Sequence, residues 1–386
     1  MTIGFDVSQA GGERKGCGQF ALQLVRALIE IAPRDDFVLY PQFGDVHVQP
    51  DPPLLAALPQ ARNVRVRRGR RDPSAERNFW REPAESLERE LGRPDIVHAN
   101  NWFCPAGLGR AKLVYTLYDL SFLEQPDCTT EANRTACFGG VFQAALRADG
   151  LLAISEFTRK RFLEHFPHIS PEKVATIGLG SRFESDRLLP RPGRLDRLTP
   201  GRFWLTVGTL EPRKNYARLV EAYRRLHAGG QADGPLVIAG GEGWLMEDFR
   251  ESIRDLEEAG QLILAGFVAD EELQWLYQNC FCFVFPSLYE GFGLPLLEAM
   301  ALGAPAIAAN VCSLPEIAGD AALLVDPSSA EEIASAMESV RADPQRRSRM
   351  AEQGLRRAQT YSWRSAAAGA LEMYRRVLRS PERAVG

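Results

Sequence analysis

The chain has 386 residues, 45% of them hydrophobic, and this length and composition predict two domains with a core each. The formal net charge of −4 provides no global positive field, which argues against a nucleic-acid partner. The seven cysteines include no Cys-x-x-Cys pair, as is typical of a reducing compartment rather than a disulfide framework. With no signal-peptide pattern and no run of about 20 apolar residues, we expect the protein in the cytoplasm or peripherally on the inner face of the membrane.

Apolar runs typical of strands alternate with helical patterns along the whole chain, which predicts an α/β fold with parallel sheets. The expected strands are 2–8, 37–40, 64–66, 95–98, 113–117, 151–154 and 174–177, then 203–207, 236–239, 262–265 and 281–286. The expected helices are 21–31, 130–147, 294–302, 330–340, 344–359 and 363–378. Prolines and glycines between 189 and 201 indicate a linker.

A glycine-rich segment, 11–20, follows the first strand and leads into helix 21–31. Its four glycines, among them Gly16 and Gly18, allow backbone to approach a ligand closely, although such loops also serve as plain turns. The segment lacks the Gly-x-Gly-x-x-Gly fingerprint of dinucleotide-binding folds, which disfavours an NAD-dependent dehydrogenase.

His98 ends the strand 95–98, and Trp102 follows in the next loop. In open α/β sheets ligands bind beyond the carboxyl ends of the strands, so we expect both side chains to contact an acceptor. For Trp102 a packing role is an equally good interpretation.

A basic run lies around the strand 64–66 and interleaves arginines with Phe79 and Trp80. The arginines are Arg62, Arg65, Arg67, Arg68, Arg70, Arg71, Arg77 and Arg81. This pattern suits peripheral contact with an anionic membrane surface or a diphosphate-bearing acceptor. A solvated loop with its arginine stems lying along the surface explains it almost as well.

The most informative stretch joins the buried strand 281–286 to the helix 294–302 through Glu290 and two glycines. Pro295 suits the first helical turn, and the amides that begin a helix attract an anion. Glu290 and Glu298 flank this point, and carboxylates accept charge-assisted hydrogen bonds from sugar hydroxyls. Two glutamates attracted only by the helix dipole are the simpler alternative.

Glu290 and Glu298, with seven residues between them, resemble the paired glutamates of retaining glycosyltransferases of family 4. The resemblance implies the GT-B fold, in which two Rossmann-like domains face a cleft. It predicts an acceptor-binding domain over 1–188, a linker over 189–201 and a nucleotide-sugar-binding domain over 202–360. The last segment, 361–386, is expected to return as a helix to the first domain.

The same resemblance assigns roles to individual residues. Lys214 is at the lysine position of the diphosphate motif 208–215, and Arg213 is expected to supply the second cation because Thr209 stands where many members carry arginine. Glu298 would bind the nucleotide ribose and Glu290 the donor sugar. The other donor-binding residues implied are Gly16, Gly18, Gly208, Gly243, Phe267, Val268, Gly291, Phe292, Gly293 and Leu294.

Tyr118 and Asp119 stand where many relatives have His-Asp beside the transferred sugar. A tyrosine can donate a hydrogen bond to a sugar hydroxyl, but unlike imidazole it cannot take a proton at neutral pH. We therefore expect Tyr118 to bind the donor and Asp119 to act at the site. A turn-capping role for Asp119 is the alternative.

The implied activity is retaining transfer of a hexose from a nucleotide-sugar to a glycan or lipid-linked saccharide. Similarity of 118–122 and 208–215 to bacterial mannosyltransferases of polysaccharide assembly makes GDP-mannose the first expected donor, followed by UDP-sugars. No metal and no cofactor are expected, because no His, Asp or Cys cluster has ligand spacing. The alternatives are a GT-B epimerase or hydrolase, or a catalytically weak sugar-nucleotide binding subunit.

Overall fold

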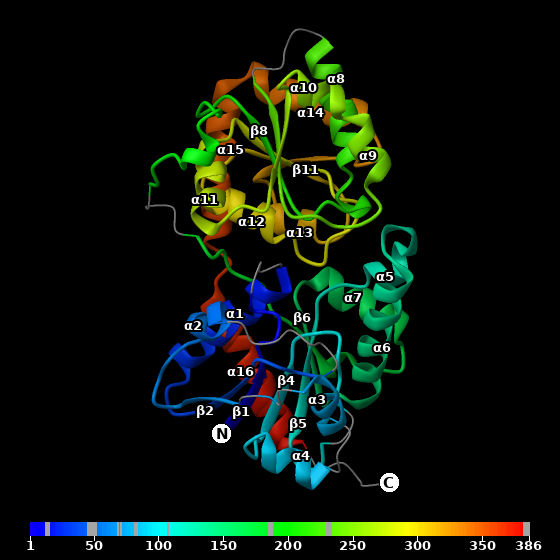
Figure 1. Ribbon diagram of the computed structural model, residues 1–386, viewed down its shortest axis with the longest axis vertical. Coiled ribbons are helices and arrows are strands. Elements are labelled where there is room, and N and C mark those ends of the chain that lie inside the picture. Colours follow the sequence, from blue (N-terminus) through cyan, green and yellow to red (C-terminus); the bar gives the residue numbers. More distant parts are fainter. Residues whose placement is uncertain are drawn as a thin grey trace. The chain divides into compact units, whose positions relative to one another are not determined.

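The computed structural model describes residues 1–11, 16–44, 52–67, 69, 72–80, 84–105, 108–183, 188–228 and 234–380. The chain divides into two compact units (Figure 1). Unit 1 comprises Met1–Leu120, Ala132–Leu179 and Ser362–Gly386, and unit 2 comprises Ser121–Glu131 and Gly180–Tyr361.

Unit 1 contains a seven-stranded parallel sheet with the order β3-β2-β1-β4-β5-β6-β7. Its strands are β1 (Thr2–Asp6), β2 (Asp36–Tyr40), β3 (Val64–Val66), β4 (Ile96–Ala99), β5 (Lys112–Leu117), β6 (Gly150–Ala153) and β7 (Val174–Thr176). Its helices are α1 (Gly16–Ile31), α2 (Pro52–Ala57), α3 (Pro73–Phe79), α4 (Ala84–Glu90), α6 (Glu131–Arg147), α7 (Glu156–His165) and α16 (Trp363–Arg379), with the 3-10 turn η2 (Pro171–Lys173). The C-terminal helix α16 packs against α1, as the sequence predicted.

Unit 2 contains a six-stranded parallel sheet with the order β10-β9-β8-β11-β12-β13. Its strands are β8 (Trp204–Val207), β9 (Leu236–Ala239), β10 (Leu262–Gly266), β11 (Cys282–Phe285), β12 (Ala306–Ala309) and β13 (Ala322–Val325). Its helices are α5 (Ser121–Glu124), α8 (Tyr216–Ala228), α9 (Glu247–Ser252), α10 (Arg254–Glu258), α11 (Asp270–Asn279), α12 (Leu294–Ala301), α13 (Leu314–Ala318), α14 (Ala330–Ala342) and α15 (Pro344–Ala358). Short 3-10 turns are η1 (Pro126–Cys128), η3 (Gly193–Leu195) and η4 (Pro212–Lys214).

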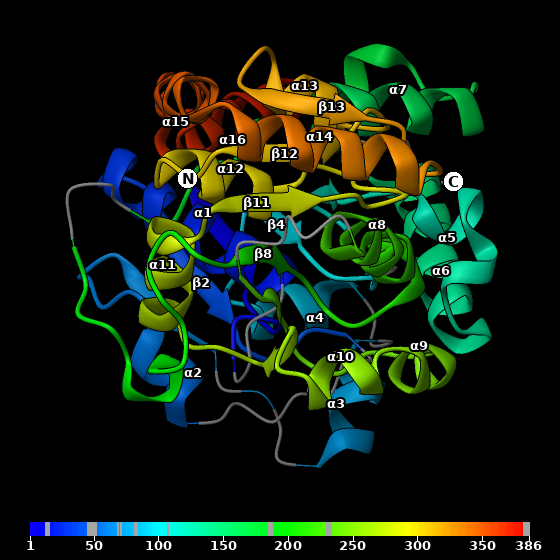
Figure 2. The same ribbon diagram turned by 90° about the horizontal axis from the view of Figure 1, so that it is seen from above.

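The two sheets share one topology, because each grows outward in both directions from its first strand. The order reverses between β1 and β4 in unit 1 and between β8 and β11 in unit 2. The central strands are apolar and buried on both faces by helices; α8 and α14, for example, pack side by side (Figures 1 and 2). In such doubly wound sheets, ligands bind beyond the carboxyl ends of the strands at the reversal point.

Three differences from the predicted boundaries are larger than a shift at the end of a strand or helix. Helix α1 begins at Gly16, so the expected first-loop motif forms the start of the helix. The division between the units falls after Leu179 rather than at 188. Residues 121–131 pack with unit 2, where the Trp244 indole N–H donates to the Cys128 carbonyl at 2.9 Å.

Among the described residues, no helix combines the length and the apolar character needed to cross a membrane.

Candidate functional site

The loops after β8 and β11 meet at the reversal point of the unit 2 sheet. These two strands are paired neighbours, so the segments that leave their carboxyl ends lie side by side. The first segment carries Arg213 and Lys214 in η4, and the second carries Glu290 just before α12. The topology therefore brings together side chains that are 76 residues apart in the chain.

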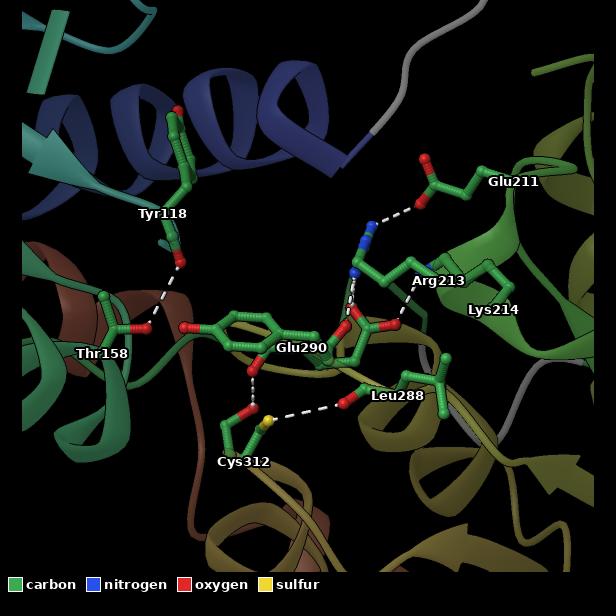
Figure 3. Close-up of polar contacts among 10 residues, drawn as sticks. Tyr118, Thr158, Glu211, Arg213, Lys214, Leu288, Glu290 and Cys312 are labelled. Atoms are coloured by element: carbon green, nitrogen blue, oxygen red, sulfur yellow. Dashed lines mark hydrogen bonds and ion pairs between the residues drawn. The ribbon is translucent and has the colours of Figure 1, made fainter. Parts of the chain in front are cut away.

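Both cations bind the same carboxylate (Figure 3). Lys214 Nζ donates to Glu290 Oε1 at 2.6 Å, and the Arg213 guanidinium donates to Glu290 Oε2 at 3.0 Å. Arg213 also pairs with Glu211, so it lies between two carboxylates. This cluster (Glu211, Arg213, Lys214 and Glu290) contains two carboxylates and two cations, so its formal net charge is zero.

Glu290 is buried, yet it stays ionised. Burial alone would raise the pKa of its carboxyl group, but the charges of Lys214 and Arg213 lower this pKa to about 2. At neutral pH, Glu290 therefore acts as an anion and a hydrogen-bond acceptor, not as a proton donor.

Backbone contacts hold the two loops in register. The Leu288 N–H donates to the Arg213 carbonyl at 2.8 Å, and Ser313 Oγ donates to the Glu290 carbonyl at 2.8 Å. Asn215 adopts a left-handed conformation at the end of η4, and its side-chain amide donates to the Pro286 carbonyl at 3.0 Å. These hydrogen bonds fix the backbone positions of the two loops that carry Arg213, Lys214 and Glu290.

Glycine is required at the start of α12. Gly293 has φ +98°, and a Cβ there would lie 2.6 Å from Leu314 Cδ2. The first amides of an α-helix have no intrahelical acceptor, and here they belong to the cap residue Gly293 and to Leu294. A donor contact from Phe292, which precedes the cap, stays a prediction. Gly291 and Phe292 are buried and complete the turn.

Two more of the expected donor-binding glycines serve close backbone packing. A Cβ on Gly243 would lie 2.0 Å from the Leu210 carbonyl oxygen, and Gly208 has φ +155° beside the Lys214 stem. Gly208 N–H donates to the Ala239 carbonyl, which joins the ends of β8 and β9. The described contacts give these glycines a structural role next to the cluster.

Phe267 and Val268 follow the edge strand β10, and only the phenylalanine is exposed, at 42%. The Arg194 guanidinium donates to the carbonyls of Ala265 and Phe267. Arginine therefore already occupies two of the backbone acceptors at this strand end.

Glu298 lies on the buried side of α12, in the helix that begins at the cluster. Arg182 Nε lies 3.2 Å from Glu298 Oε1. Burial raises the pKa of Glu298, whereas Arg182 lowers it, and the pKa remains above its ordinary value. Whether Glu298 binds ribose stays a prediction.

In unit 1 the Tyr118 hydroxyl has an internal partner. It donates to the Asn100 carbonyl at 2.8 Å, and the ring lies edge-on to Phe20 and Trp102. The Tyr118 carbonyl accepts from Thr158 Oγ1 at 3.4 Å (Figure 3). The hydroxyl thus donates within unit 1, and its expected hydrogen bond to a sugar stays a prediction. The adjacent Asp119 is partly exposed.

Gly16 and Gly18 lie in the first turn of α1, Gly16 exposed and Gly18 buried. A Cβ on Gly18 would lie 2.1 Å from the Gln9 carbonyl oxygen, so this glycine lets the helix approach the loop after β1. Their expected contact with the donor stays a prediction.

The expectation that His98 contacts an acceptor is corrected by its burial. Its ring is fully inaccessible, with Nδ1 2.5 Å from the Tyr374 hydroxyl and Nε2 2.8 Å from Thr116 Oγ1. Burial lowers the pKa of His98 to about 3, so the ring is neutral. His98 joins the sheet to α16. Trp102 is partly exposed, and its contact with an acceptor stays a prediction.

The basic run is corrected in part. Phe79 and Trp80 are buried, and Arg67 pairs with Glu76 at 2.8 Å while lying over the Phe79 ring. These residues pack inside unit 1 rather than facing lipid. Arg62 and Arg65 are exposed. Arg68, Arg70, Arg71, Arg81 and the side chain of Arg77 lie outside the described residues.

Sequence reasoning missed three residues of unit 2 that shape the site. Glu211 lies within the recognised motif and its acidic side chain was a visible signal. The sequence around Ser313 and Arg182 gave no such signal, because each residue acts through a partner distant in the chain.

No group of acidic, histidine or cysteine side chains suited to a metal ion occurs in the described part of the chain.

Comparison with protein families accounts for most of the sequence. Residues 15–181 match the family described as Glycosyltransferase Family 4, and residues 195–357 match Glycosyl transferases group 1. The chain is 32% identical over 285 residues to O-antigen chain mannosyltransferase B of Escherichia coli, covering 72% of this chain and 74% of that protein. It is 33% identical to a serotype-specific mannosyltransferase WbdA of Escherichia coli, covering 79% of this chain and 40% of that protein.

Solved structures share the architecture at low sequence identity. Sucrose-phosphate synthase from Thermosynechococcus elongatus matches with a TM-score of 0.73 at 20% identity, covering 98% of this chain and 99% of that one. Anabaena Alr3699/HepE, in complex with UDP and glucose, matches with a TM-score of 0.72 at 18% identity, covering 97% and 100%. The predicted fold class, two Rossmann-like units of the GT-B type, is confirmed.

Proposed function

Since the chain belongs to glycosyltransferase family 4, a family of retaining enzymes that use nucleotide-sugar donors, we propose that it transfers mannose from GDP-mannose to a hydroxyl group. The acceptor in this proposal is a glycan or a lipid-linked saccharide. Similarity to two mannosyltransferases of Escherichia coli supports mannose as the sugar. A UDP-sugar is the alternative donor.

The observation that carries the proposal is the convergence of Arg213 and Lys214 on Glu290 at the reversal point of the unit 2 sheet. In the proposed reaction, departure of the nucleoside diphosphate concentrates negative charge on its phosphate oxygens. Two cations held in place before the reaction stabilise that charge without reorganising. The amides of Phe292 to Leu294 add to this stabilisation, and Gly293 leaves room for the phosphate.

Glu290 has a second role in the proposal. Because its low pKa keeps it ionised, it can accept hydrogen bonds from the hydroxyls of the donor sugar. Its negative charge also favours the positive charge that develops at the anomeric carbon. Glu298, further along α12, is assigned to the ribose.

The proposed proton acceptor is the departing phosphate, on the face of the sugar from which it leaves. This assignment needs no basic side chain for the acceptor hydroxyl and matches retention of configuration. Asp119 and Trp102, both partly exposed in unit 1, are proposed to position the donor sugar or the acceptor.

A donor screen tests the proposal. The purified chain is incubated with GDP-mannose, GDP-fucose, UDP-glucose or UDP-N-acetylglucosamine, with and without mannose-terminated oligosaccharides. Acceptor-dependent release of GDP and an α-linked mannose product seen by NMR are expected. Release from a UDP-sugar would replace the donor, whereas acceptor-independent turnover would indicate an epimerase or a hydrolase.

A further inference from the structure

Arg182 reaches Glu298 from a segment that precedes the unit 2 sheet in the chain. Its Nε lies 3.2 Å from Glu298 Oε1, and the two side chains are only 11% and 6% exposed. Its NH1 lies 3.6 Å from Asp270 Oδ1 at the start of α11. A guanidinium thus bridges a buried carboxylate and a more exposed one.

Local contacts fix the direction in which Arg182 points. The guanidinium carbon lies 4.7 Å from the centroid of the Phe183 ring, and that ring lies edge-on to Tyr277. The Phe183 N–H donates to Ser181 Oγ at 3.0 Å, which closes a tight turn around Arg182. Arg182 is therefore held against α11 and α12 rather than extended into solvent.

The charges around Glu298 oppose one another. Burial raises the pKa of Glu298, Arg182 lowers it, Asp270 raises it and the Tyr277 hydroxyl lowers it. Burial also disfavours a charged Arg182, but Glu298 and Asp270 raise its pKa, so the guanidinium remains protonated. Without Arg182, burial and Asp270 would together favour the neutral carboxyl form of Glu298.

We propose that Arg182 is a positioning residue for the nucleotide: by holding one oxygen of Glu298, it turns the second oxygen toward the ribose hydroxyls of the donor. This inference rests on the proposed function, in which Glu298 is the ribose contact. The carboxylate form accepts stronger hydrogen bonds than the neutral acid.

The test compares Arg182→Gln with Arg182→Lys and Asp270→Asn. GDP and 2′,3′-dideoxy-GDP are titrated by calorimetry from pH 5.5 to 8.5. Arg182→Gln is expected to weaken GDP binding at pH 7 by roughly 10-fold or more. This loss corresponds to one charged hydrogen bond between Glu298 and the ribose. Its GDP affinity should rise with pH as Glu298 ionises. Arg182→Lys should recover part of the affinity, and Asp270→Asn should bind GDP at least as well as wild type.

The dideoxy nucleotide separates positioning from general damage. Because it lacks the ribose hydroxyls, Arg182→Gln and wild type should bind it equally. If Arg182→Gln lost affinity equally for both nucleotides, or for neither, the proposed role of Arg182 would be wrong, while the proposed function would stand. If the wild-type protein bound no nucleoside diphosphate at all, the proposed function itself would fail.

Discussion

Lys214 Nζ donates a hydrogen bond to Glu290 Oε1 at 2.6 Å, and this contact joins the loops that follow β8 and β11. Both residues are buried, so water screens their attraction little. Arg213 adds a second cation on the other carboxylate oxygen. The proposed site is therefore charged and organised before any donor binds.

Glu290→Gln is expected to separate binding from turnover. Removing the negative charge releases Lys214 from its carboxylate partner and leaves Arg213 paired with Glu211, so affinity for the nucleoside diphosphate should stay the same or increase. Turnover should fall about 100-fold or more, because stabilisation of the transition state is lost. Calorimetry and product release measure the two quantities. A parallel loss of affinity and turnover would contradict this assignment.

The stability of the protein should depend on Glu290 at low pH. Its folded-state pKa of about 2 lies below the value of about 4.3 expected in the unfolded chain. The carboxylate therefore contributes stability above about pH 4.3, and this contribution declines as pH falls toward 2, by about 1.4 kcal/mol per pH unit. The difference in unfolding free energy between wild type and Glu290→Gln should narrow as pH falls from about 4.3 toward 2. A constant difference would show that the ion pair is not stabilising.

Gly293→Ala should destabilise the protein by about 1–3 kcal/mol, because φ +98° is strained for any residue with a Cβ. Gly139→Ala is the matched control. It lies within α6, where a Cβ meets no atom within 4 Å, and should stabilise by about 0.5–1 kcal/mol. Denaturant unfolding measures both. Shifts of the same sign would refute the backbone argument.

Tyr118→Phe tests whether the Tyr118 hydroxyl is structural. Loss of the hydrogen bond to the Asn100 carbonyl should cost about 1 kcal/mol of stability. The kcat/KM for the donor should stay within about twofold of wild type. A tenfold drop in kcat/KM with unchanged stability would show that the Tyr118 hydroxyl takes part in donor binding.

Much of this fold could be predicted because parallel strands covered on both faces are continuous apolar runs bounded by glycine and proline. The positions of Arg213, Lys214 and Glu290 could be predicted for a related reason, since they lie just after such runs. The start of α1 could not. Glycine has low helix propensity, yet the helix begins at Gly16 and includes Gly18, which packs closely on the Gln9 carbonyl.

Other features depend on partners that the local sequence does not encode. His98 resembled a ligand-binding residue at a strand end, yet its ring is bound by Tyr374, 276 residues further along the chain. The role of Arg182 could not be predicted from the sequence around it, because it depends on ion pairs with Glu298 and Asp270. Tertiary contacts of this kind decide which polar residues remain available to a ligand.

The central claim is that the Lys214 cluster binds the diphosphate of the donor, and a titration with Lys214→Met tests it most directly. Lys112→Met is the control, because Lys112 is also largely buried and lies 3.8 Å from its partner Asp149 in unit 1. Calorimetry with GDP and UDP should show binding to wild type and to Lys112→Met, and at least tenfold weaker binding to Lys214→Met. Equal affinity in both variants, or no binding to the wild-type protein, would contradict the account.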